Sequence, residues 1–161
     1  MAKLLIVYHS MTTGTQQLAE AAAAAAGEEV DTVLKKAPDA GPDDLLSADG
    51  YLFAAPENLA AIAGAMKHFY DRCYYQVLGK IEGRPYAQMV CAGSDGENCA
   101  KQTARIATGW RLKAVQEPLI ICTHAQTTEE ILATKTIPET DLAKCRELGA
   151  ALGAGLAMGV F

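Results

Sequence analysis

A short run of hydroxyl side chains is the first place in this sequence where binding chemistry can be expected. Four hydroxyl residues surround one glycine: Ser10, Thr12, Thr13, Gly14 and Thr15. The run follows the apolar segment 4–7 and precedes the alanine-rich segment 18–26, which predicts a buried strand, a polar loop and the first turn of a helix. A helix N-terminus offers free N–H groups and the positive end of its dipole, which favours phosphate. Serine and threonine are also common helix caps and turn residues, so both interpretations stay open.

Length and composition limit the classes of protein to consider. The 161 residues favour a single domain, 1–161, and half of them are hydrophobic, enough for a core. Only 6% are aromatic, so aliphatic side chains and alanine must fill most of that core. The net charge of −5 argues against nucleic acid as a partner, although backbone dipoles can still hold an anionic ligand.

The cysteines and the chain ends predict a reduced, cytoplasmic protein. None of the five cysteines forms a CxxC pair, and the histidines are not at zinc-ligand spacing, so we expect buried thiols and no metal site. The start of the chain lacks a signal-peptide pattern, and the apolar stretch 148–161 is too short to span a bilayer, so no membrane insertion is expected.

The elements that position the hydroxyl loop alternate between strand and helix. Strands are expected at 3–8, 29–34, 51–56, 86–92 and 115–122, the last disturbed by Pro118. Helices are expected at 15–26, 43–48, 61–76, 99–108 and 139–158, with a short helical turn at 129–132. This alternation predicts a three-layer, doubly wound, five-stranded parallel sheet. The order 2-1-3-4-5 places the half-exposed second strand at an edge.

In such a sheet, ligands bind beyond the carboxyl ends of the strands, at the switch point between strands 1 and 3. Three loops should meet there: 9–15 after the first strand, 56–60 after the third and 92–98 after the fourth. The first and the last are rich in glycine or small polar residues, which let the backbone approach a flat ligand.

The three loops also resemble those of a known family. SMTTGT at 10–15 resembles the phosphate loop of flavodoxins, and AGSDGEN at 92–98 resembles a flavin loop of related reductases. PENLAAIAGAMKHFYDR at 56–72 resembles a segment of flavodoxin-like NAD(P)H-dependent FMN reductases and quinone reductases. The resemblance implies a flavodoxin-like fold with FMN as the cofactor.

The resemblance also assigns roles to single residues. The FMN phosphate would be bound by the loop that holds Thr13, through Ser10, Thr12 and Thr15 and the backbone N–H groups of Gly14 and Gln16. The isoalloxazine ring would be lined, mostly by main chain, by Pro56, Glu57, Asn58 and Leu59. Its other edge would be bordered by Gly93, Ser94, Asp95 and Gly96. Two positions depart from the family pattern and predict weaker binding: Thr13 replaces a glycine, which shifts the expected tight turn by one residue, and Ala60 replaces another.

The absence of aromatic residues from two of the loops bears on the reaction. Flavodoxins that carry electrons, as a family, sandwich the flavin between aromatic side chains, and none occurs at 57–62 or 93–98. An open ring face would admit a nicotinamide or a quinone. We therefore expect an FMN-dependent oxidoreductase with NAD(P)H as co-substrate and a quinone or other small acceptor, without a catalytic acid or base. The alternatives are a one-electron carrier for a partner protein and a non-catalytic binding protein of this fold.

Several other residues have an ordinary and a functional interpretation. We expect His124 to be a loop residue without catalytic role, and Cys99 to be a buried thiol rather than a helix-end thiolate. Three tyrosines could form a stacking or dimer surface, but we expect them to serve the core and a helix surface: Tyr70, Tyr74 and Tyr75. Four glycines in the last helix predict close packing against the sheet or another subunit: Gly149, Gly153, Gly155 and Gly159. Related reductases often form dimers, so a homodimer is expected.

Overall fold

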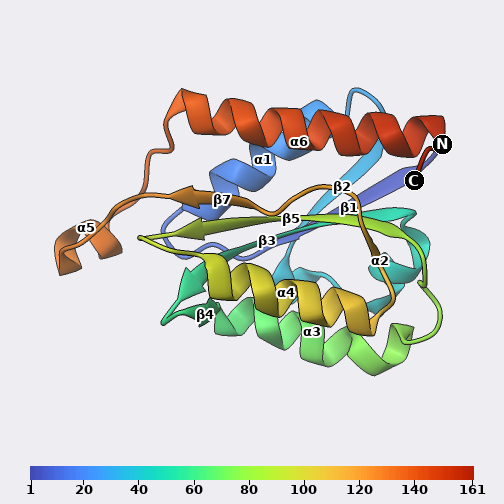
Figure 1. Cartoon of the computed structure of the whole chain (residues 1–161), viewed down its shortest axis with the longest axis horizontal. Helices are drawn as coiled ribbons and strands as arrows, with labels where there is room; N and C mark the ends of the chain where they lie inside the picture. Colours follow the sequence, from blue (N-terminus) through green and yellow to red (C-terminus); the bar gives the residue numbers. More distant parts are fainter.

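The computed structural model describes residues 1–161 and shows a parallel sheet with helices on both faces (Figure 1). Its strands are β1 (Lys3–Tyr8), β2 (Asp31–Lys36), β3 (Gly50–Asn58), β5 (Pro85–Ala92), β6 (Lys113–Ala114) and β7 (Leu119–Cys122). The order is β2-β1-β3-β5, and the fifth position is shared by β6 and β7, which both pair with β5. All these pairs are parallel. The predicted five-stranded sheet of order 2-1-3-4-5 is confirmed.

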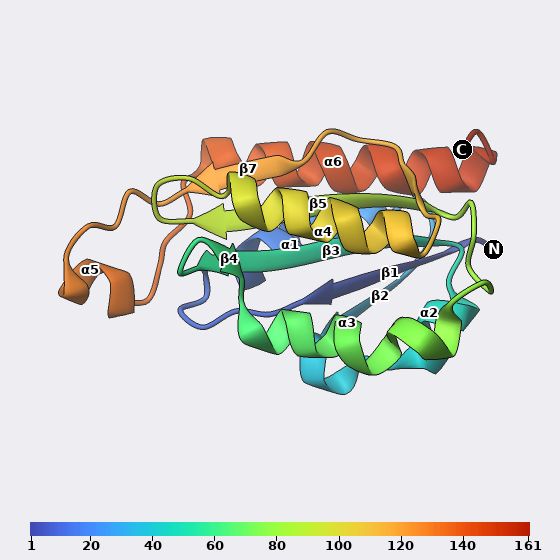
Figure 2. The ribbon, with the colours of Figure 1, turned by 60° about the horizontal axis from the view of Figure 1, so that its bottom comes forward.

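The long helices form the two outer layers. α1 (Gly14–Ala26) and α6 (Glu139–Met158) cover one face, and α3 (Gly64–Val77) and α4 (Glu97–Gly109) cover the other (Figures 1 and 2). The central strand β1 is buried from Leu4 to Tyr8, because helices cover both faces of the sheet and its alternate side chains enter the two cores. No helix is both long enough and apolar enough to cross a membrane.

Most of the aromatic side chains gather in the core under α3 and α4. Tyr70 is buried and meets Trp110 edge to face, with ring centroids 6.0 Å apart. Tyr74 stacks on the same indole at 5.7 Å, whereas Tyr75 is exposed. The core role is confirmed for Tyr70, and Tyr75 lies on the helix surface.

Several element boundaries differ from the expected ones, among them the start of β2, the start of α3 and the start of the last strand. β2 begins at Asp31 and not at 29, because the Val30 amide still donates to the Ala26 carbonyl (3.1 Å) in the turn that closes α1. Residues 61–62, expected in a helix, form the antiparallel strand β4 (Ala61–Ile62) beside β3. The expected strand 115–122 is wrong over 115–118, because Pro118 has no N–H to donate to a neighbouring strand.

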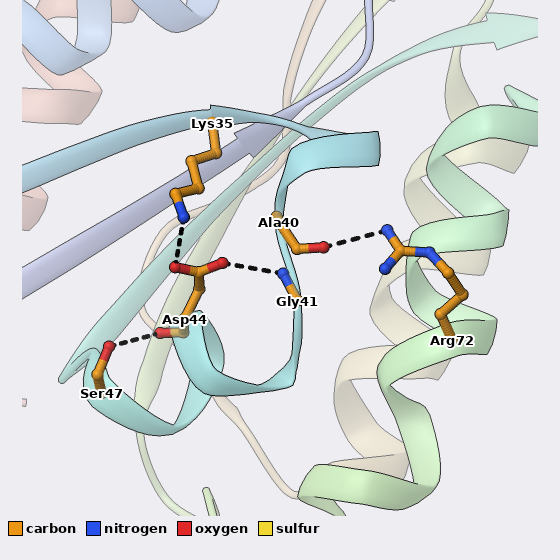
Figure 3. Close-up of polar contacts among 6 residues, drawn as sticks. All are labelled: Lys35, Ala40, Gly41, Asp44, Ser47 and Arg72. Atoms are coloured by element: carbon orange, nitrogen blue, oxygen red, sulfur yellow. Dashed lines mark hydrogen bonds and ion pairs between the residues drawn. The ribbon is translucent and has the colours of Figure 1, made fainter.

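Charged side chains hold the connection between β2 and β3 in place (Figure 3). It contains the turn η1 (Ala37–Asp39) and α2 (Pro42–Ser47), close to the predicted helical turn at 43–48. The Asp44 carboxylate accepts from the Gly41 amide (2.9 Å) and from the Lys35 ammonium (2.8 Å). Arg72 on α3 donates to the Ala40 carbonyl (3.1 Å). These contacts join the connection to β2 on one side and to α3 on the other.

The glycines of α6 allow close packing inside the chain. A Cβ atom on Gly149 would lie 2.2 Å from the Ala22 carbonyl oxygen of α1, and one on Gly153 would lie 3.1 Å from that of Ala26. Gly155 makes room for the Phe161 ring. The close packing of this helix is made with α1 and Phe161, not with the sheet, and Gly159 instead ends the helix at φ 64°. These glycines give no separate support for a second subunit.

Candidate functional site

A cavity opens at the carboxyl edge of the sheet, at the switch point between β1 and β3. It is lined by four segments of chain, which contribute Ser10, Met11, Thr12, Gly14 and Thr15; Pro56, Glu57 and Asn58; Cys91, Ala92 and Gly93; and Thr123, Ala125, Ile131 and Lys135. The first three segments are the loops that the sequence predicted would meet. Eight of the fourteen predicted site residues line the cavity, so the topology brings the loops together as expected.

The first loop presents polar groups that lack partners. The hydroxyl oxygens of Ser10 and Thr15 are buried and have no hydrogen-bond partner in the chain, and the whole Thr15 residue is only 2% exposed. No side chain caps the N-terminus of α1, and no acidic residue lies in its first turn. Buried hydroxyls and free helix amides normally find an acceptor or donor. Their convergence on one cavity fits a bound phosphate group.

The sequence led us to expect the tight turn of this loop at Gly14, one residue later than in the family pattern. That expectation was wrong. Thr13 itself takes the left-handed conformation, with φ 72°, which strains a β-branched residue. Its hydroxyl donates to the Lys135 carbonyl (3.2 Å), and Thr13 does not line the cavity. Glycine is required at position 14 for a different reason, because a Cβ atom there would lie 2.8 Å from the Cys91 sulfur. The Gln16 side chain also leaves the cavity and donates to Glu20.

The second loop is a tight hairpin fastened to α4. Leu59 and Ala60 form its two-residue turn, with φ 53° and 60°, between the paired residues of β3 and β4. The Glu57 carboxylate accepts from the amides of Gly96 (2.9 Å) and Cys99 (3.0 Å). Since its side chain serves the start of α4, Glu57 can contribute mainly backbone to a ligand. Leu59 does not line the cavity, and its side chain is fully exposed at the hairpin tip.

The third loop contributes less to the cavity than predicted. Gly93 lines it, whereas Ser94, Asp95 and Gly96 do not. Gly96, at φ 90°, is the residue from which α4 starts, and the Asp95 carboxylate accepts from the Glu97 amide (3.1 Å). The end of this loop is thus occupied with starting α4.

A fourth segment lines the cavity and was not predicted. It follows β7, carries the short helix α5 (Thr128–Leu132) and projects beyond the sheet at the same end as β4 (Figures 1 and 2). Thr123, Ala125 and Ile131 reach the cavity, and Lys135 brings the only ammonium group among the lining residues. Two signals were available in the sequence: a long connection after a strand at the binding edge, and a single lysine within it.

Two thiols near the site are buried, and the one histidine after β7 lies outside the cavity. Burial raises the pKa of Cys91 to about 11, against weaker opposing effects from Thr15 and the Lys135 charge. Burial and the nearby Glu57 carboxylate raise the pKa of Cys99 to about 12. Both thiols are therefore protonated at neutral pH, and the ordinary interpretation of Cys99 is confirmed. His124 is exposed and does not line the cavity.

The order of the strands and a hydroxyl-lined cavity at the switch point define a flavodoxin-like protein. Residues 28–127 match the family described as NADPH-dependent FMN reductase, and the chain belongs to that family. The match does not include the first loop, 10–16, whose assignment depends on the geometry described above.

Individual relatives divide between two activities. A protein named flavodoxin from Aquifex aeolicus is 33% identical over 86 residues, covering 52% of this chain and 46% of the relative. A protein named NAD(P)H dehydrogenase (quinone) from Acidithiobacillus ferrooxidans is 32% identical, covering 45% of this chain and 47% of the relative. Each match thus covers just under half of the relative's length. The solved structure of an archaeal flavodoxin superposes with a TM-score of 0.78 and 18% identity over 96% of this chain and 98% of that one, which shows a shared fold.

Proposed function

We propose that this chain binds FMN at the carboxyl edge of its sheet and passes electrons from NAD(P)H to a quinone or another small acceptor. FMN binding is supported above all by the buried, unpartnered hydroxyl of Thr15, together with that of Ser10 and the uncapped start of α1. Phosphate supplies acceptors for all of these donors at once. The Thr12 hydroxyl lines the same cavity and would complete the set.

The flavin ring would lie along the backbone of Pro56, Glu57 and Asn58 on one side and near Gly93 on the other. When bound, FMN supplies the acceptance and donation of hydride, and the protein supplies orientation. The hairpin turn is fixed from α4, because the Asn98 side chain donates to the Ala60 carbonyl and the Gln102 side chain accepts from the Ile62 amide (2.9 Å). The backbone that would face the ring is therefore held in place before any ligand arrives.

Two features favour a reductase over an electron carrier. No tryptophan, tyrosine or phenylalanine lines the cavity, so one face of the ring would stay open to a nicotinamide or a quinone. Two exposed apolar side chains also line the cavity, Met11 on the first loop and Ile131 on α5. Such side chains suit an apolar acceptor better than a water-soluble ion.

The second candidate is a flavodoxin-type carrier, which is favoured by the likeness to an archaeal flavodoxin over nearly the full length of both chains. The two functions separate in one assay. The purified protein, loaded with FMN, is mixed with NADPH or NADH and a soluble quinone, and the loss of the nicotinamide absorbance is followed. We expect quinone-dependent oxidation of the nicotinamide. Tight FMN binding without that oxidation would support the carrier, and no flavin binding would contradict both.

We also propose that the chain forms a homodimer, as its resemblance to dimeric reductases implies. Sedimentation of the FMN-loaded protein at micromolar concentration tests it, and a monomer under those conditions would contradict it.

A further inference from the structure

The segment after β7 is fixed to the phosphate loop by a set of backbone and amide contacts. The Lys135 amide donates to the Thr12 carbonyl (2.8 Å), and the Lys135 carbonyl accepts from the Gln17 side chain (2.7 Å). The oxygen of the same Gln17 amide accepts from the Ile137 amide (3.1 Å). Because Gln17 lies in α1, Lys135 is held against the start of that helix, not on a freely moving loop.

The ammonium group of Lys135 is ordered but carries no counterion. It donates to the carbonyls of Ile131 (2.8 Å) and Ala133 (2.6 Å) and to the Thr12 hydroxyl (3.3 Å). All three partners are neutral, and the ion pairs of the chain involve other lysines and arginines. The positive charge therefore stays uncompensated beside the cavity that Lys135 lines.

The same cavity contains groups that need an acceptor. Thr15, which is only 2% exposed, has a hydroxyl without a partner, and so has Ser10. The one acidic residue that lines the cavity, Glu57, has its carboxylate engaged with the amides of Gly96 and Cys99. A fixed cation, free hydroxyls and an uncapped helix N-terminus are complementary to a single anion.

We propose that Lys135 is a specificity-determining residue that makes this cavity select phosphate monoesters, and so FMN over riboflavin. The choice of a flavin rests on the function proposed above, whereas the preference for phosphate rests on the lysine and the hydroxyls alone. Lys135 supplies a point charge from its fixed position beside the start of α1, and short hydroxyls supply the directional hydrogen bonds. The half-buried position of the charge leads us to expect an effect of about tenfold on affinity for a phosphate-bearing ligand.

A purely structural role makes a different prediction. If Lys135 only closed the C-terminal end of α5 through the Ile131 and Ala133 carbonyls, its loss would loosen the segment and weaken every ligand equally. Only a charge acting on phosphate separates FMN from riboflavin and adds a dependence on salt.

The test measures the dissociation constants of FMN and riboflavin by quenching of flavin fluorescence, at low and high salt. Lys135→Met should weaken FMN about tenfold, change riboflavin by less than about twofold and flatten the salt dependence for FMN, while Lys135→Arg keeps most of the FMN affinity. Lys113→Met is the matched control. This exposed lysine is on β6 at the opposite end of the sheet, and removing the same charge there should change neither ligand.

Equal losses for FMN and riboflavin in Lys135→Met, or no loss for FMN, would overturn the inference and leave the proposed function standing. If Lys135→Met does not fold, the wild-type chain still tests the proposal. An affinity of the wild-type chain for FMN that does not fall as salt rises would contradict it. Inorganic phosphate serves as a probe without flavin, through its protection of the chain against thermal unfolding. Protection that requires Lys135, in a protein that binds no flavin, would support the inference and reject the proposed function.

Discussion

Replacing Thr15 by valine should change the stability of the ligand-free protein and its affinity for FMN in opposite directions. Thr15 is 2% exposed and its hydroxyl has no partner in the chain, so folding removes it from water without compensation. The nearest candidate is the Cys91 thiol, which is a weak partner. Valine keeps the shape of the side chain and a similar helix propensity while removing the hydroxyl.

The magnitude follows from that missing partner. A buried, unsatisfied polar group costs roughly 1–3 kcal/mol, so Thr15→Val should raise the free energy of unfolding of the ligand-free protein by about 1 kcal/mol or more. For a chain of this size, each kcal/mol corresponds to about 2–4 °C in melting temperature. A hydrogen bond to a charged phosphate contributes about 1.5–3 kcal/mol, so FMN affinity should fall roughly 10- to 150-fold.

Urea unfolding of the ligand-free protein and fluorescence titration with FMN measure the two effects separately. Thr103→Val on α4 is the matched control, because that buried hydroxyl does have a partner, the Cys99 carbonyl at 3.0 Å, and does not line the cavity. The control should lower stability by up to about 1 kcal/mol and leave FMN affinity unchanged. A less stable ligand-free Thr15→Val, or one with unchanged FMN affinity, would refute the reasoning.

Two further predictions concern packing and pH. Gly149→Ala should destabilise the protein by about 1–3 kcal/mol, because the new Cβ atom would lie 2.2 Å from the Ala22 carbonyl oxygen and must push α6 away from α1. Urea unfolding measures this loss. The control is Gly64→Ala, whose Cβ atom would meet nothing within 4 Å and should leave the free energy of unfolding unchanged or raise it. The pKa of Cys91 is raised by burial from 9.0 to about 11, so the stability that this thiol contributes is complete below pH 9.0 and is lost as the pH rises through about 11. Unfolding curves across that interval should show the decline, and an unchanged midpoint there would contradict the assignment.

The fold was accessible from the sequence because its signals are local. Unbroken apolar strands, amphipathic helices and short polar loops alternate along the chain, and the known handedness of crossovers leaves few arrangements for them. The misplaced parts have local causes too. Strand pairing by two residues, as in β4, is too short to leave a periodic pattern, and one of its amides, that of Ile62, donates to Gln102 of a later helix.

The candidate site was accessible only in part, because its contacts join distant segments. The loops after β1, β3 and β5 follow from the switch-point rule, which places them at one edge. The position of Lys135 depends instead on Gln17, a residue more than a hundred positions earlier, which donates to the Lys135 carbonyl. No pattern of residue spacing in the sequence predicts this contact. It arises from the course of a long loop over the finished fold.

Strained backbone conformations are also concentrated at the carboxyl edge of the sheet, where the cavity lies. Five residues other than glycine have a positive φ, and four of them lie on the loops at the carboxyl ends of the strands: Thr13, Leu59, Ala60 and His124. Each such conformation is disfavoured by about 1–3 kcal/mol and persists only where surrounding contacts determine it. Those contacts are present: Gln17 donates to Thr13, Asn98 donates to the Ala60 carbonyl, and the His124 amide donates to the Gly93 carbonyl. The resemblance leads us to expect glycine at two of these positions, and in this chain side-chain hydrogen bonds to Thr13 and Ala60 hold the turns instead, so this edge is set before a ligand arrives.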